Sequence, residues 1–313
     1  MKRILIYTLI LCLLISGCGG MPKSDDPDSG YTFTDDLGRQ VSVNDPKRVA
    51  ALLGSFADVW VLAGGSLCAA AEDAWEDFGL SLDEAINIGG AHSPSLELLL
   101  SSDPDLVIAS ASTASHLEME EILEAAGIAV AYFDVDHFDD YLHMLEICTN
   151  MTGRNDLYDQ NGLQIQAQIQ AIKAQFATDN VPENQRKVLL IRAAASVIKA
   201  KGSAGTILGE MLADMGCINI ADSDGSLLED LSVEAVIQQQ PYHIFVVTMG
   251  GDPEAAKASL EAMLRENTAW SSLEAVREGR VHYMDKTMFN LKPNAKWAVS
   301  YEKLYEILKN ETM

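Results

Sequence analysis

The stretch S-L-E-L-L-L-S-S-D-P-D-L-V-I, Ser95–Ile108, occurs again as S-V-E-A-V-I-Q-Q-Q-P-Y-H-I-F, Ser232–Phe245. In each copy a Ser precedes a short apolar helical pattern, a Glu follows two residues later, and a Pro stands seven residues after that Glu, before an apolar strand. A Ser at that place caps a helix, and a Pro prevents the helix from continuing. Two such units predict two similar α/β lobes, each presenting one carboxylate, Glu97 or Glu234, at an equivalent position.

Short apolar runs alternate with helical patterns along most of the chain, which is typical of mainly parallel sheets with crossover helices. A leading hairpin is expected at residues 31–43. Further strands are expected at 49–53, 67–71, 106–109, 129–133, 187–191 and 281–284, and helices at 56–63, 116–126, 138–151, 206–215, 260–267 and 294–309. The predicted fold class is therefore α/β, with two Rossmann-like lobes.

Residues 154–178 interrupt this alternation, because they keep apolar residues at helical spacing with Gln and Ala between them and contain no strand pattern. Their length and their place between the two repeat copies predict a single long connecting helix. We therefore expect an N-terminal lobe over 31–152, an interlobe helix over 153–180 and a C-terminal lobe over 181–313, with a ligand cleft between the lobes.

The N-terminus has the composition of a secretory signal. A basic start, M-K-R, precedes the apolar residues 4–15, a run too short for the roughly 20 residues that span a membrane. The following I-S-G-C resembles a bacterial lipobox. It predicts a signal peptide over 1–17 and lipidation at Cys18, with a plain signal peptide and an incidental cysteine as the alternative. Residues 18–30 are rich in Gly, Pro, Ser and Asp and are expected to form a flexible tether to the membrane.

The composition excludes several classes of function. The 313 residues include 22 Lys and Arg against 46 Asp and Glu, a net charge of −24 that disfavours binding to nucleic acid. No phosphate-binding loop, nucleophile elbow or zinc-protease motif stands in a strand–turn–helix setting. We therefore expect neither enzymatic activity nor a cofactor.

Three cysteines, Cys68, Cys148 and Cys217, remain beyond the signal, and they show no metal-binding spacing. Their apolar neighbours favour three buried thiols. A Cys68–Cys148 disulfide is the alternative in an oxidising compartment.

In open α/β sheets, ligands bind beyond the carboxyl ends of the strands. Arg192 follows an apolar strand and suits the oxygens of an anionic ligand, although a surface ion pair would also explain it. Trp75 is either a stacking wall or a half-buried core residue, and Trp297 is expected to anchor the last helix. The candidate cleft residues are Ser55, Trp75, Ser112, His137, Arg192, Met249, Phe289, Asn290 and Lys292.

Several segments together resemble a known family. They are T-D-D-L-G-R-Q-V followed by P-K-R-V-A-A-L, the paired helix-to-strand units, and the late K-P-N-A-K-W. In these segments the chain resembles the class III solute-binding proteins of ABC importers, which bind ferric siderophores, haem or cobalamin. The resemblance implies two lobes joined by one rigid helix, a small-molecule chelate in the cleft, and a monomer that delivers it to an ABC permease and ATPase. It also implies that Glu97 and Glu234 meet Arg residues of the permease.

Two other functions remain open at this point. A free divalent metal could bind the same architecture through His92 and His137, with Asp134 and Asp136 beside the latter. A lipoprotein of this fold could instead act as a surface adhesin or sensor. The other histidines are expected in loops or at the surface.

Overall fold

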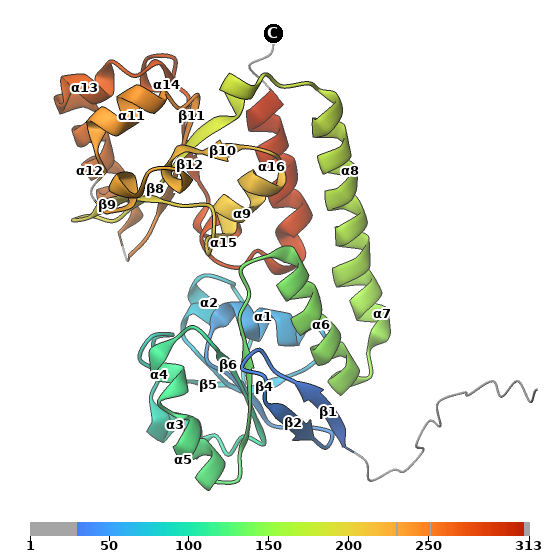
Figure 1. Cartoon of the computed structure of the whole chain (residues 1–313). Coiled ribbons are helices and arrows are strands. Elements are labelled where there is room, and N and C mark those ends of the chain that lie inside the picture. Colours follow the sequence, from blue (N-terminus) through green and yellow to red (C-terminus); the bar gives the residue numbers. More distant parts are fainter. Residues whose placement is uncertain (1–29, 230, 251, 310–313) are drawn as a thin grey trace, which may run out of the picture.

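Two five-stranded sheets form the centres of two lobes in the computed structural model, which describes residues 30–229, 231–250 and 252–309 (Figure 1). The predicted signal peptide, Cys18 and nearly all of the tether lie outside the described residues. Within the described residues, no helix is both long and apolar enough to cross a membrane.

The N-terminal sheet is entirely parallel and has the strand order β5-β4-β3-β6-β7. Its strands are β3 (Val49–Ala51), β4 (Leu67–Ala70), β5 (Ile86–Asn87), β6 (Leu106–Ser110) and β7 (Ala129–Phe133), and the hairpin of β1 (Tyr31–Thr34) and β2 (Gln40–Val43) precedes them. The helices of this lobe are α1 (Gly54–Leu62), α2 (Asp73–Glu76), α3 (Leu96–Ser101), α4 (Ala114–Leu117), α5 (Glu120–Ala125) and α6 (Phe138–Thr152). Strands β3 and β6 are fully buried because helices cover both faces.

The C-terminal sheet repeats this order as β10-β8-β11-β12, which corresponds to β4-β3-β6-β7. Its strands are β8 (Lys187–Ala193), β9 (Ile198–Lys201), β10 (Ile218–Asn219), β11 (His243–Thr248) and β12 (Val281–Met284). Its helices are η2 (Glu183–Arg186), α9 (Ile207–Asp214), η3 (Ile220–Asp222), α10 (Gly225–Glu229), α11 (Val233–Gln239), α12 (Pro253–Glu266), α13 (Thr268–Ser271), α14 (Glu274–Arg277) and α15 (Lys286–Phe289). Strand β9 was not expected; it folds back antiparallel on β8.

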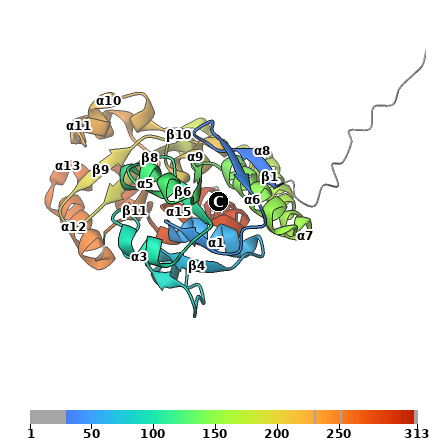
Figure 2. The same cartoon turned by 90° about the horizontal axis from the view of Figure 1, so that it is seen from below.

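The connecting helix runs from Asn155 to Thr178 as α7 (Asn155–Tyr158), a π-helical turn η1 (Asp159–Leu163) and α8 (Gln164–Thr178). A Cβ at Gly162 would stand 2.7 Å from a methyl of Leu142 on α6, so the glycine lets the two helices approach closely. The last helix, α16 (Trp297–Lys309), packs along α8, and the short η4 (Asn294–Lys296) before it packs against α1. Both views place α8 at the edge of the molecule away from α12 and α13 (Figures 1 and 2).

The final segment also fixes the C-terminal lobe to the N-terminal lobe. The Asn294 side-chain amide donates to the Ser55 carbonyl and to the Asp58 carboxylate, both at 2.8 Å. Trp297 is 1 % exposed and packs edge-to-face against Phe138, which confirms its expected anchoring role.

Some sequence expectations were wrong in detail. The helix predicted over 116–126 is two short helices, and α12 begins at Pro253, earlier than expected, because Asp252 caps it. His116 and His243 are buried in the core rather than placed at the surface. The His116 ring is accommodated because its Nδ1 accepts from the Ser110 amide and its Nε2 lies 2.7 Å from the Ala91 carbonyl.

The three described cysteines are free thiols. Cys148 and Cys217 are buried, and burial raises the pKa of both thiols. Cys68 is only half-buried, because it lies at the edge of the core beside Ser102. The structure therefore carries no Cys68–Cys148 disulfide.

Candidate functional site

A cluster of cations lies where β8 and β9 pair. In the antiparallel register Arg192 stands directly opposite Lys199, and alternation along β9 puts Lys201 on the same face as Lys199. Like charges directly opposite each other destabilise a sheet. The arrangement therefore concentrates positive charge on one face of a chain that is acidic overall.

Arg192 carries most of this unbalanced charge. Its Nε is buried and makes no hydrogen bond to any residue that the structure describes. Burial lowers the pKa of the guanidinium, and no carboxylate opposes that effect. Burial and the charges of Arg192 and Lys199 likewise lower the pKa of Lys201. A half-buried guanidinium without an acid partner is costly unless a ligand supplies the missing anion.

Lys292 links this cluster to the other lobe. Burial lowers its pKa, Asp136 and Asp134 act in the opposite direction, and Arg192 lowers it further. Asp134 and Asp136 follow β7 at the edge of the N-terminal sheet. Lys292 therefore lies within electrostatic reach of both the cations of one lobe and the carboxylates of the other.

A pocket of about 710 Å³ opens beside the cations. Arg192 and Lys201 line it together with Ala200, the loop 202–206, Leu228 and two carboxylates. These carboxylates, Asp222 and Glu210, accept from the Ser203 and Gly205 amides of the loop. Met249, 40 % exposed, lies next to it, since its amide donates to the carbonyl of Ala193. Positive charge, loop backbone and apolar side chains together suit an anionic ligand with a bulky body.

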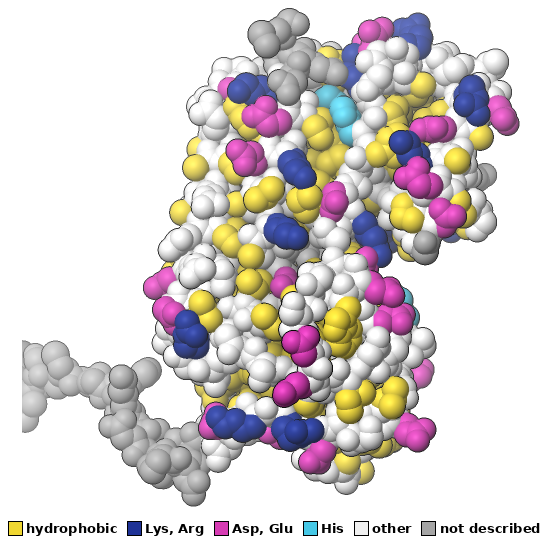
Figure 3. All heavy atoms as spheres, turned by 180° about the vertical axis from the view of Figure 1, so that it is seen from behind, with side chains coloured by type: hydrophobic (Ala, Val, Ile, Leu, Met, Phe, Trp, Pro, Cys, Tyr) yellow, Lys and Arg dark blue, Asp and Glu magenta, His cyan; other side chains and the backbone are white. Residues whose placement is uncertain are grey.

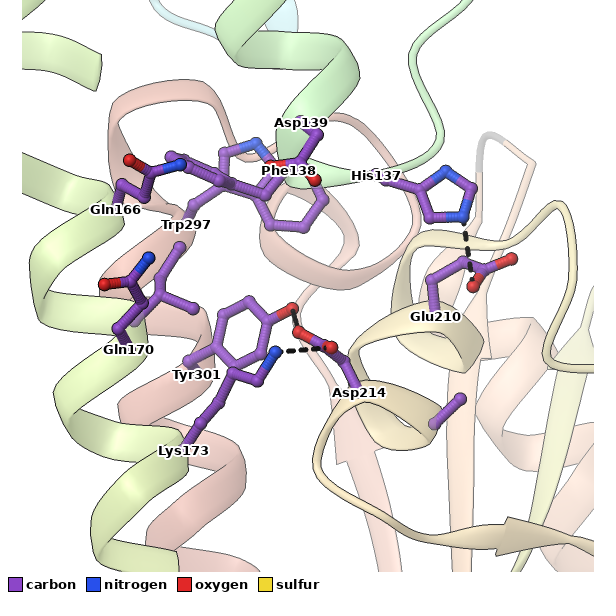
Figure 4. Close-up of a pocket in the computed structure, with 12 residues that line it drawn as sticks. His137, Phe138, Asp139, Gln166, Gln170, Lys173, Glu210, Asp214, Trp297 and Tyr301 are labelled. Carbon is purple, nitrogen blue, oxygen red and sulfur yellow. Dashed lines mark hydrogen bonds and ion pairs between the residues drawn. The ribbon is translucent and has the colours of Figure 1, made fainter. Parts of the chain in front are cut away.

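A second pocket, of about 540 Å³, lies between α8, α9, α16 and the start of α6 (Figure 4). His137 stands at its rim, with Nδ1 3.1 Å from Asp140 and Nε2 3.2 Å from Glu210 of the other lobe. Lys173, Asp214 and Tyr301 form a bonded chain on its wall.

The remaining predicted cleft residues divide into three groups by their exposure. Ser55 and Phe289 are buried, at 5 % and 2 % exposure, and belong to the packing between the lobes. Trp75 and Asn290 are half-buried, and the Oδ1 of Asn290 has no hydrogen-bond partner among the described residues. Ser112 is exposed just beyond β6.

Lys199 and Lys201 were missed as candidates in the sequence. The alternating K-A-K after the Arg192 strand was the available signal, because in a hairpin both lysines fall on one face. A hairpin was not predicted there.

The repeated units have matching local structure. The Ser95 hydroxyl accepts from the Leu98 amide at 3.3 Å, and the Ser232 hydroxyl from the Ala235 amide at 3.4 Å. Each helix is followed by a residue in the left-handed region immediately before the proline: Asp103 and Gln240 both have φ 48°. The two units are therefore equivalent in backbone as well as in sequence.

Glu97 and Glu234 are exposed in the first turns of α3 and α11. Neither carboxylate bonds to another residue in the part of the chain that the structure describes. Both helices lie on the side of the molecule away from α8 (Figures 1 and 2). The two carboxylates are thus free to meet a partner from one side.

Metal-binding side chains are dispersed. Across residues 30–229, 231–250 and 252–309 there is no group of three or more His, Cys, Asp or Glu that could hold a metal ion. His92 is exposed, and both ring nitrogens of His137 face carboxylates. The described residues therefore give no support to a free-metal site.

The sequence model of the periplasmic binding protein family matches residues 49–288, more than half of the chain. The chain belongs to the periplasmic binding protein family. Members of this family bind substrates outside the cytoplasm and work with an ABC permease and ATPase.

Relatives of known sequence cover nearly the whole chain. The Fe(3+)-citrate-binding protein YfmC of Bacillus subtilis is 25 % identical over 294 residues, 90 % of this chain and 89 % of its own. The putative ABC transporter substrate-binding lipoprotein YhfQ of the same organism is 22 % identical over 309 residues, 93 % of each chain.

Solved structures show the same fold. Staphylococcus aureus SirA complexed with staphyloferrin B has a TM-score of 0.69 at 21 % identity, covering 89 % of this chain and 98 % of its own. The vitamin B12 binding protein BtuF of Vibrio cholerae has a TM-score of 0.69 at 19 % identity, covering 85 % of this chain and 98 % of its own. The α/β fold with two lobes is thereby established, and the predicted family is confirmed.

Proposed function

We propose that this protein is the lipid-anchored substrate-binding component of an ABC importer and that it captures an anionic ferric chelate. The observation that carries the proposal is the half-buried Arg192, whose buried Nε has no acid partner among the described residues, grouped with Lys199, Lys201 and Lys292. The 25 % identity to a Fe(3+)-citrate-binding protein supports the choice of an iron complex. Anchoring would be through Cys18.

Free carboxylate oxygens on the chelate match the cation cluster. A guanidinium binds a carboxylate through two parallel hydrogen bonds, and the lysines add attraction without fixed geometry. The apolar part of the chelate would contact Met249 and Leu228, which are 40 % and 41 % exposed. The protein performs no chemistry in this account; binding follows from charge pairing and desolvation.

The lobes 31–152 and 181–313, joined by the helix within 153–180, provide the cleft in this proposal. The pairing of α8 with α16 and the bonds of Asn294 stiffen the junction, so lobe movements on binding are expected to be small. The space-filling view shows the outline indented between the two lobes (Figure 3). We expect the protein to act as a monomer.

Glu97 and Glu234 are proposed to dock the loaded protein on the permease. They occupy equivalent positions, are exposed on the same side, and have no partner among the described residues. Charge-assisted pairs with permease arginines would be directional and salt-sensitive, which suits reversible docking.

A thermal-shift screen of the purified mature protein tests the ligand. The panel contains ferric citrate, a neutral ferric hydroxamate, haem, cobalamin, iron-free citrate and bare divalent metals. A ligand at 100 times its dissociation constant adds roughly 2.7 kcal/mol of stability. We expect ferric carboxylate complexes to give the largest shift. A larger shift with the neutral hydroxamate or cobalamin would contradict the proposal, and a shift with bare metal alone would point to a metal carrier.

A further inference from the structure

One titratable side chain bridges the two lobes. His137 begins α6 in the N-terminal lobe, and its Nε2 lies 3.2 Å from the carboxylate of Glu210, which stands on α9 in the C-terminal lobe. Its Nδ1 lies 3.1 Å from the carboxylate of Asp140, one turn along its own helix. Figure 4 shows the imidazole and Glu210 pointing toward each other, joined across the rim of the second pocket.

The strength of this bridge depends on the protonation state of the His137 ring. A neutral imidazole carries one N–H and one acceptor nitrogen, whereas both nitrogens of His137 face carboxylate oxygens, which only accept. The two carboxylate contacts are strongest when the ring is doubly protonated, whereas a neutral ring can serve Glu210 through Nε2 and accept from the Asp140 amide. We infer that His137 and Glu210 form a proton-dependent bridge that favours the closed arrangement of the lobes. The consequence for ligand affinity rests on the function proposed above.

The charges that face His137 come from three places. Asp140 lies on its own helix, Asp136 on the preceding loop and Glu210 on α9. The other charged groups of the second pocket are Asp139, Lys173 and Asp214, and the last two pair with each other. Burial acts to lower the pKa of His137, but the hydrogen bond from its ring to the Asp140 carboxylate and the charges of Glu210, Asp140 and Asp136 outweigh it, so the pKa is raised.

The sign of the pH dependence follows from the position of Glu210. Even the small lobe movement expected here would lengthen the 3.2 Å contact with this carboxylate and weaken its effect, so the pKa of His137 falls on opening and closure takes up a proton. The bridge is complete below the pKa of the open form and is lost as the pH rises through the higher pKa of the closed form. Closure, and with it affinity, should therefore strengthen from pH 8 to pH 6.

The bridge also touches the ligand pocket. The other oxygen of Glu210 accepts from the Gly205 amide at 3.1 Å, and Gly205 lines the pocket that holds Arg192 and Lys201. By contrast, the ion pair between Lys286 and Asp77, at 2.8 Å, joins the lobes without a histidine. The chain thus combines an interlobe contact that depends on protonation of a histidine with one that does not.

Titration of the histidine ring signals by NMR tests the bridge without any ligand. In the wild type, the pKa of His137 should lie above that of a free histidine. In Glu210→Gln, which keeps an acceptor for Gly205, the proton affinity of His137 should fall by about two- to fivefold, the range expected for a partly exposed ion pair. His143, half exposed and 3.9 Å from Asp36, serves as the internal reference. An unchanged pKa of His137 in this variant would overturn the proposal.

Affinity measurements for ferric citrate at pH 6 and pH 8 test the consequence. The pH also changes the speciation of the chelate, but it does so equally for all variants. We therefore compare, for each variant, the affinity at pH 6 divided by the affinity at pH 8. That ratio should be about two- to fivefold larger in the wild type than in His137→Gln or Glu210→Gln, and His143→Gln should match the wild type. An equal ratio in His137→Gln would overturn the link to affinity. If the pKa of His137 falls in Glu210→Gln but the protein does not bind ferric citrate, the bridge is supported and the proposed ligand is refuted.

Discussion

The two lobes share a scaffold but differ in the charge that they bring to the cleft. Strands β4-β3-β6-β7 and β10-β8-β11-β12 follow the same order, and each lobe carries a Ser-capped helix that ends before a proline. At the cleft, however, the N-terminal lobe offers Asp134 and Asp136, whereas the C-terminal lobe offers the cluster around Arg192. In the proposed function, the repeated fold supplies two equivalent positions for docking and two unlike surfaces for recognition of the ligand.

The difference extends to the way charge is stabilised. In the N-terminal lobe, Arg39 is paired with Asp35, Glu120 and Glu124, so a partly buried cation is fully compensated. In the C-terminal lobe, Arg192 has no such acid. Since the chain carries 46 acidic residues, the missing partner of Arg192 indicates a site that a ligand completes.

The largest expected difference between the lobes is in their stability at low pH, where the C-terminal lobe should be destabilised more. Burial, aided by nearby charges, lowers the pKa of His243 to about 3 and that of His282 to about 4. The Nδ1 of His243 lies 2.9 Å from the Nε2 of His282. Because these folded-state values lie below that of a free histidine, their contribution to stability is complete above about pH 6.5 and declines as the pH falls, approaching about 1.4 kcal/mol per pH unit for each histidine.

Hydrogen exchange at pH 6.5 and pH 4.5 measures this effect. Peptides of β11 and β12 should lose more protection than those of β6 and β7, and His282→Gln should reduce the difference. His143→Gln, at an exposed histidine, is the control. Equal losses in both sheets would contradict the account.

The next largest expected effect is on the free energy of unfolding, when the hydrogen bonds at the junction between the lobes are removed. Asn294 is fully buried, has φ 52° and donates two hydrogen bonds into the N-terminal lobe, so Asn294→Ala should lower the free energy of unfolding by about 2–4 kcal/mol. Asn180→Ala is the matched control, since Asn180 has φ 51° but is exposed. Similar losses in both variants, measured by urea unfolding, would show that backbone conformation and not the interlobe bonds accounts for the effect.

Unlike ligand recognition, docking on the permease should depend on both lobes in a similar way. Glu97→Ala and Glu234→Ala should each reduce uptake of the chelate by several-fold, and the double variant by about tenfold or more, while affinity stays unchanged. Glu121→Ala, at an exposed glutamate of the N-terminal lobe, is the control. Undiminished uptake by the double variant, assayed in cells that lack the native protein, would remove the docking role.

Much of the fold was predictable because its signals are local. The Ser-x-Glu and Pro pattern identified both helix-to-strand units, and the register of Glu97 with Glu234 revealed the repeat. Hairpin β8–β9 was missed because the residues between its strands, A-A-S-V, carry no Gly, Asn or Asp turn signal. The burial of His116 was missed because its partners, Ser110 and Ala91, come from separate segments.

The site was predictable only in part. Arg192 was identified because it follows the predicted strand 187–191, although it lies within β8, and Lys292 because it stands just before the last helix on the expected cleft side. Their mutual electrostatic effect depends on tertiary structure. Phe289 and Ser55 also follow strands, and the chain from α15 to η4 buries both of them at the lobe junction. Position after a strand indicates the edge of the sheet, whereas packing decides which side chains remain open.

Calorimetric titration of ferric citrate into the wild type and Arg192→Gln tests the central claim most directly. The account predicts a loss of about ten- to a hundredfold in affinity, the value of a hydrogen-bonded charge pair, together with a ligand-free protein at least as stable as the wild type, because an uncompensated buried cation is removed. Arg277→Gln, at an exposed arginine of the same lobe, should bind as the wild type does. Equal affinity in Arg192→Gln and the wild type would contradict the account.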